Sequence, residues 1–154
     1  MSRIIWFIYF LSHASKNIKF ISYTFVIINR FVFSIYISPL AKIDHTVKFC
    51  YQGLGIVIGG DSEVGANCEI GQNVTIGGRY SANEVKKGYP KIMHNTFIGP
   101  GSAVLGPILI EDNVIVGANS TVIKNVSRQS IVVGSPAKRI KIIKKRLEGD
   151  KYEI

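Results

Sequence analysis

Branched or large apolar residues recur every six positions along most of this chain. These anchor positions are Ile37, Ile43, Phe49, Ile58, Val64, Ile70, Ile76, Ile92, Ile98, Val104, Ile110, Val116 and Val122. Neither an α-helix nor an alternating strand has a period of six residues. A fixed internal period predicts instead that the chain coils on itself, with each turn stacked on the one before.

The other positions of the six-residue repeat, or hexad, also have a regular chemistry. Glycine often follows the anchor, as at Gly59, Gly65, Gly71, Gly77, Gly99 and Gly117. Three positions after the anchor stand Asp61, Asn67, Asn73, Asn95, Asn113, Asn119 and Asn125. These residue types tolerate the left-handed backbone region, so each hexad predicts a short strand followed by a corner. Three hexads would make one triangular coil, with strands stacked about 4.8 Å apart.

The first 36 residues have no hexads and are rich in Ile, Phe and Tyr. The apolar run 4–11 is too short to span a bilayer, and the second run, 20–37, contains Asn29 and Arg30. We expect two short helices that cap the open end of the coil. Contact with a membrane surface is the alternative, because aromatic residues and nearby lysines suit an interface. The aromatic residues concerned are Trp6, Phe7, Tyr9 and Phe10.

The six-residue period is interrupted twice. Three extra residues lie between Phe49 and Ile58, and a polar insertion at 79–91 separates Ile76 from Ile92. The insertion predicts an external loop on the coil wall. The expected organisation is therefore a helical leader at 1–36, a coil at 37–137 and a basic tail at 138–154. A β-sandwich fits less well, because its turn signals come every 8–12 residues.

Charge and cysteine content narrow the picture further. The net charge of +9 is unevenly distributed, with seven basic and three acidic residues after Gly134. No nucleic-acid-binding motif accompanies this basic tail, which could be simply solvated. Cys50 and Cys68 make no disulfide framework, and Cys68 falls at a small-residue position where a packed thiol is expected. This suits a cytoplasmic protein, and the inner face of the membrane is the alternative location. The scattered histidines and cysteines lack metal-ligand spacing, so no metal is expected.

Three stretches carry a family resemblance. They are GIVIGGDSEVGANCEIGQNVTIGG at 55–78, YPKIMHNTFIGPGSAVLG at 89–106, and VVGSPAKRI at 132–140. In order and spacing they resemble the serine acetyltransferase branch of the hexapeptide-repeat acyltransferases. The resemblance implies an all-β solenoid, a left-handed parallel β-helix. It also implies acetyl transfer from acetyl-CoA to a hydroxyl, and a homotrimer with active sites between neighbouring subunits.

The chain departs from that family in two ways. Only some 36 residues precede the coil, where serine acetyltransferases carry a large helical domain. This favours a short sugar O-acetyltransferase of surface-polysaccharide biosynthesis over a serine O-acetyltransferase. In addition, the family's catalytic histidine is replaced by Gln52 or Tyr51, and its second histidine by Tyr89. A trimeric scaffold without catalysis is therefore a third hypothesis.

The reaction needs a base for the acceptor hydroxyl and donors for the oxyanion. Histidine suits the base, and His94, directly after the loop, is the first candidate, with His45 second. Both could instead be corner histidines in solvent. Stacking by hexads places them on one face, two coils apart.

The remaining candidates are binding residues. The expected contacts of the acceptor are Tyr51, Gln52, Gln72, Tyr89 and Lys91. The expected contacts of CoA are Gly77, Gly78, Ser102, Ala118, Ser120, Pro136, Lys138 and Arg139. Cationic side chains at the last two positions suit the phosphates of the nucleotide. Acetyl-CoA is expected as a co-substrate, with no resident cofactor.

Overall fold

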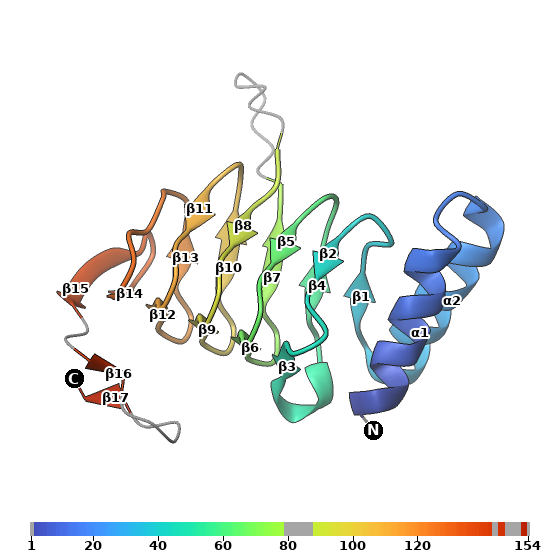
Figure 1. Ribbon diagram of the computed structural model, residues 1–154, viewed down its shortest axis with the longest axis horizontal. Coiled ribbons are helices and arrows are strands. Elements are labelled where there is room, and N and C mark those ends of the chain that lie inside the picture. Colours follow the sequence, from blue (N-terminus) through green and yellow to red (C-terminus); the bar gives the residue numbers. More distant parts are fainter. Residues whose placement is uncertain (1, 79–87, 143–144, 147–151, 154) are drawn as a thin grey trace.

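The computed structural model describes residues 2–78, 88–142, 145–146 and 152–153. Two helices lie at one end of a stack of short strands, and the C-terminal strands lie at the other end (Figure 1). The helices are α1 (Ser2–Ala14) and α2 (Lys19–Phe33). The two-helix leader expected from the sequence is therefore present.

Successive strands fall into three parallel sheets, because each hexad supplies one strand and every third strand pairs. Sheet A contains β1 (Tyr36–Ile37), β4 (Val57–Ile58), β7 (Thr75–Gly77), β10 (Ala103–Leu105) and β13 (Thr121–Val122). Sheet B contains β2 (Lys42–Ile43), β5 (Glu63–Val64), β8 (Lys91–Ile92) and β11 (Leu109–Ile110). Sheet C contains β3 (Lys48–Phe49), β6 (Glu69–Ile70), β9 (Phe97–Ile98), β12 (Ile115–Val116), β14 (Ser130–Val133) and β15 (Lys138–Ile142).

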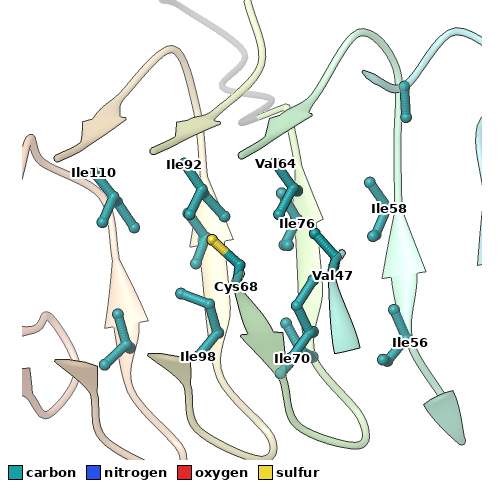
Figure 2. Close-up of a cluster of buried hydrophobic side chains, with 14 of the residues drawn as sticks. Val47, Ile56, Ile58, Val64, Cys68, Ile70, Ile76, Ile92, Ile98 and Ile110 are labelled. Carbon is teal, nitrogen blue, oxygen red and sulfur yellow. The ribbon is translucent and has the colours of Figure 1, made fainter. Parts of the chain in front are cut away.

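Anchors pair with anchors throughout the stack, as in Ile58 with Ile76 and Val64 with Ile92. Most anchor side chains are buried in one continuous core, and Figure 2 shows several of them pointing into the interior of the coil. Ile43 and Phe49, in the first coil, are only partly buried. The Cys68 thiol is fully buried and donates a hydrogen bond to the Met93 carbonyl (2.9 Å), as its small-residue position predicted.

The corners use left-handed residues as expected at five asparagines. These are Asn67, Asn73, Asn95, Asn113 and Asn119. Asp61 differs, because Gly60 takes the left-handed conformation one residue earlier in that hexad. Asp61 therefore needs no left-handed backbone.

Helix α1 closes the open end of the first coil. The Tyr9 hydroxyl donates to the Ala41 carbonyl (2.7 Å), and the Trp6 ring lies 5.7 Å from the Phe49 ring, centroid to centroid. Burial raises the pKa of Tyr9 above its usual value, which keeps the hydroxyl protonated as a donor. In the described part of the chain, no helix is both long and apolar enough to cross a bilayer.

Two boundaries differ from the sequence expectation. Lys91 opens strand β8, because its anchor neighbour Ile92 pairs with Val64, so the insertion ends before it. Residues 79–87 of the expected loop lie outside the described residues. The basic tail is not merely solvated, since β15 pairs antiparallel with β14, although its side chains are exposed. β16 (Lys145–Arg146) and β17 (Tyr152–Glu153) form a further antiparallel pair.

Candidate active site

The coil has three edges, named here by the sheets that they join. The AB edge comprises the described residues of 38–41, 59–62, 78–90 and 106–108. The BC edge comprises residues 44–47, 65–68, 93–96 and 111–114. The CA edge comprises residues 50–56, 71–74, 99–102 and 117–120. In a triangular coil, the BC edge lies opposite sheet A.

A groove of about 550 Å³ runs along the outside of sheet B and ends against α1. All three histidines of the chain line it: His13 from α1, and His45 and His94 from the BC edge. We call it the histidine groove. The stacking predicted for His45 and His94 is confirmed, since β2, β5 and β8 are consecutive strands of sheet B.

The hydrogen bonds of His94 argue against its predicted role as the base. Its Nδ1 lies 3.0 Å from the backbone N–H of Ala66, which can only donate, so Nδ1 accepts. The neutral ring must then carry its proton on Nε2. In this arrangement Nε2 can donate a hydrogen bond but cannot take a proton from a hydroxyl.

His45 is better arranged to act as a base. Its Nδ1 lies 3.6 Å from a carboxylate oxygen of Asp44, a distance beyond a direct hydrogen bond but within ion-pair range. The same oxygen accepts from the Thr46 N–H (2.9 Å) and hydroxyl (2.6 Å), and these bonds hold the pKa of Asp44 below its usual value. A charged Asp44 favours the proton on Nδ1, which leaves Nε2 free to accept one. The side chain of His45 is 90% exposed.

His13 is a groove residue that the sequence did not assign to the site. Its Nδ1 lies 2.7 Å from the Pro39 carbonyl, which can only accept, so Nδ1 carries the proton and Nε2 is open. The signal was absent from the sequence, because only the packing of α1 on the first coil brings His13 to sheet B. Asp44, by contrast, could have been found as the direct neighbour of His45.

Lys91 also lies in the histidine groove, away from the expected acceptor contacts Tyr51, Gln52 and Gln72 on the CA edge. Glu63 accepts from Lys42 (3.0 Å) and lies 3.3 Å from Lys91 on the next strand. The bond from Lys42 is the main cause of the lowered pKa of Glu63, with a smaller effect from Lys91. Lys91 is thus part of a charge ladder across β2, β5 and β8.

The CA edge carries the expected acceptor contacts Tyr51, Gln52 and Gln72. Tyr51 and Gln52 both have left-handed backbones, with φ of 46° and 58°, inside the short 3₁₀ turn Cys50–Gly53. Such conformations are strained for large side chains and cluster at functional sites. Tyr51 is 78% exposed. In the next coil, Oε1 of Gln72 is buried without a hydrogen-bond partner among the described residues.

Gly77 faces open space on the outside of sheet A. Among the described residues, a Cβ atom built there would have nothing within 4 Å, so the stacking of the coil does not require glycine at this position. At the equivalent position Gly71, a Cβ would lie 2.6 Å from the backbone nitrogen of Pro100. An adjoining feature is the Tyr89 ring, which lies against Gly60 and near Gly78 at the AB edge.

The other expected CoA contacts divide into two groups. Ser102 and Ser120 are buried, and their hydroxyls bond backbone groups: Ser102 donates to the Gly117 carbonyl, and Ser120 accepts from the Gly134 N–H. Because this hexad position points inward, only the backbone groups of these two serines could pair with a pantetheine arm outside the coil. The positions that are partly or fully exposed are Ala118, Pro136, Lys138 and Arg139.

The segment around Pro136 continues sheet A. The Thr121 N–H donates to the Gly134 carbonyl, and the Ala137 N–H donates to the Thr121 carbonyl. Three strand spacings, about 14 Å, therefore separate Gly77 from this segment along one face. We call this surface, from Gly77 to Pro136, the sheet A face.

One chain thus holds two separate sets of groups. The sheet A face and CA edge carry the exposed backbone at Gly77, the strained Tyr51 and the unpaired buried Oε1 of Gln72, but no histidine. The histidine groove lies on the far side of the coil. Among the described residues, no cluster of three or more metal-ligating side chains is present.

Comparisons with known proteins agree with this architecture. The family model described as bacterial transferase hexapeptide (six repeats) matches residues 89–124. A serine acetyltransferase of Staphylococcus aureus (strain Mu50 / ATCC 700699) is 43% identical over 114 residues, which are 74% of this chain and 52% of that protein.

Solved structures give the same result. A serine acetyltransferase of Neisseria gonorrhoeae superposes with a TM-score of 0.82 at 28% identity, covering 90% of this chain and 54% of that one. The coenzyme A complex of the Brucella abortus strain S19 enzyme gives 0.81 at 27% identity, covering 88% and 54%. The chain spans about half the length of these relatives. By repeat, fold and sequence, it is a left-handed parallel β-helix of hexapeptide repeats that is similar to the serine acetyltransferases.

Proposed function

We propose that this protein transfers an acetyl group from acetyl-CoA to a hydroxyl, and that CoA lies along the sheet A face. The observation that carries the proposal is the open position at Gly77, in a coil similar to that of a serine acetyltransferase solved with coenzyme A. A side chain there would fill space that the described residues leave open. Ala118 and Pro136 would border the pantetheine arm, and Lys138 and Arg139 would meet the phosphates.

The acceptor binds, in this proposal, at the CA edge beside the sheet A face. The unpaired Oε1 of Gln72 would accept a hydrogen bond from the bound substrate. This bond would offset the free-energy cost of burying a carbonyl oxygen without a partner. Serine is the first acceptor to test, since the similar proteins are serine acetyltransferases. A sugar hydroxyl is the second, favoured by the exposed Tyr51 ring, on which a sugar ring could stack.

The base must come from elsewhere, because the histidines lie opposite the sheet A face. We infer a homotrimer in which the BC edge of one chain meets the sheet A face of its neighbour. His45 would take the proton of the acceptor hydroxyl and pass it to the CoA thiolate that leaves. His94, as an Nε2–H donor, would stabilise the oxyanion of the tetrahedral intermediate.

The test is release of free CoA thiol from acetyl-CoA in the presence of serine or of simple sugars. The expected result is acceptor-dependent release that falls about 10²–10⁴-fold in His45→Ala, the range for loss of a general base. His94→Ala should retain more activity than His45→Ala. If no acceptor stimulates thiol release in any preparation, the proposal is contradicted and a scaffold without catalysis is favoured.

A further inference from the structure

The helical leader buries several polar side chains (Ser12, Ser22 and Asn29) beside the apolar Ile5 and Val26, and it exposes many large apolar ones. On α2 the buried positions are Ser22, Val26 and Asn29, spaced along one stripe that faces α1. Ser22 donates to the Ser12 carbonyl of α1 (3.1 Å), and Asn29 is 2% exposed with its Oδ1 unpaired among the described residues. In water, helices normally expose their polar face, so buried polar side chains beneath an apolar exterior favour contact of this exterior with an apolar partner.

The exposed surface of the two helices is dominated by large apolar side chains. They are Ile4, Phe7, Phe10, Ile18, Phe20, Ile21, Tyr23, Ile27, Ile28, Phe31 and Val32. Phe20 and Phe31 are 85% and 83% exposed. A continuous apolar surface of this kind marks a site of interaction. We call these residues the leader surface.

The charges of the leader have one sign. Every charged residue among residues 1–36 is basic: Arg3, Lys16, Lys19 and Arg30. Lys16 lies in the turn between the helices, and Lys19 is the first residue of α2. A second copy of the same surface would bring like charges together, whereas an anionic lipid surface would complement them.

The helices are too short to span a bilayer. With 13 and 15 residues, they are about 20 and 22 Å long, against about 30 Å for the hydrocarbon core. We propose that the leader surface docks on an anionic lipid bilayer and lies within its interface, holding the coil at the membrane. This inference does not depend on the proposed acetyl transfer.

Sedimentation with vesicles of phosphatidylcholine, with and without phosphatidylglycerol, tests the proposal. The wild-type protein should sediment with the vesicles, more with phosphatidylglycerol and less at high salt. The double change Phe20→Ser and Phe31→Ser should weaken binding about tenfold or more. Both side chains are exposed, so the melting temperature of the coil should stay unchanged.

Matched variants separate the leader from the tail. Ile140→Ser with Ile142→Ser removes two exposed apolar side chains from β15 and should leave vesicle binding intact. Lys16→Glu with Lys19→Glu should lose the phosphatidylglycerol preference, whereas Lys124→Glu, on the coil, should keep it. Wild-type protein that stays in the supernatant, or equal loss in the β15 variant, would overturn the proposal. So would a change in oligomer mass, without any loss of vesicle binding, in the Phe20/Phe31 variant.

Discussion

Gly77 and Gly71 occupy the same place in their hexads but are glycine for different physical reasons. At Gly71 the next coil leaves no room for a Cβ, whereas at Gly77 the space outside the coil is open. The sequence shows two identical positions, and only the coordinates separate them. None of the described residues thus requires glycine at position 77, and the open space there would admit a ligand.

This difference predicts opposite effects of side chains at the two positions. Gly77→Val should leave thermal stability unchanged but weaken CoA binding at least about tenfold, or ~1.4 kcal/mol, measured by calorimetric titration. Gly71→Ala should destabilise the fold by about 1–3 kcal/mol, because a Cβ would meet the Pro100 backbone. Undiminished CoA binding by folded Gly77→Val would show that CoA does not approach this position.

Asp44 should make the BC edge sensitive to acid. Its pKa is lowered in the folded protein, chiefly by the Thr46 bonds, with smaller effects from His45 and His94. Its contribution to stability is thus present above the unfolded pKa of about 3.9 and is lost as the pH falls through the lower folded value. The difference in melting temperature between wild type and Asp44→Asn should shrink below about pH 4. A difference that is constant with pH would contradict this assignment.

At the scale of the element, the hexad period predicts where the strands lie, how they pair and which side chains they bury. The anchors, the strand pairing and the left-handed asparagines follow from a repeat in which each position has one environment. The helices were predictable as helices, but not the groove that α1 forms with sheet B. Residues such as His13 meet the coil through tertiary packing alone, and the bond from Ala66 to His94 depends on stacking geometry that no pattern encodes.

Strand β12 offers a direct test of the stacked interior. Val116 is fully buried between Ile98 and Val132, so Val116→Asp would place an unpaired charge in the core and cost several kcal/mol. Its neighbour Ile115 points to the other face and is partly exposed, so Ile115→Asp should cost much less. Thermal unfolding measures both. Equal stability of the two variants would rule out the interior described here.

At the scale of the whole molecule, the binding face and the histidines are on opposite sides of one coil. A continuous surface runs from Gly77 to the segment around Pro136, while His45 and His94 lie on the BC edge. Under the proposed function, each active site would need groups from two chains. The proposed homotrimer would bring these two sets of groups together.

Mixing two inactive variants tests this claim most directly. Gly77→Val chains retain His45, and His45→Ala chains retain the sheet A face, so mixed trimers contain some interfaces with both parts intact. After the two variants are unfolded and refolded together, acceptor-dependent release of CoA thiol should recover to a measurable fraction of the wild-type rate. A mixture that remains as inactive as its components, although mixed trimers form, would contradict a site shared between chains.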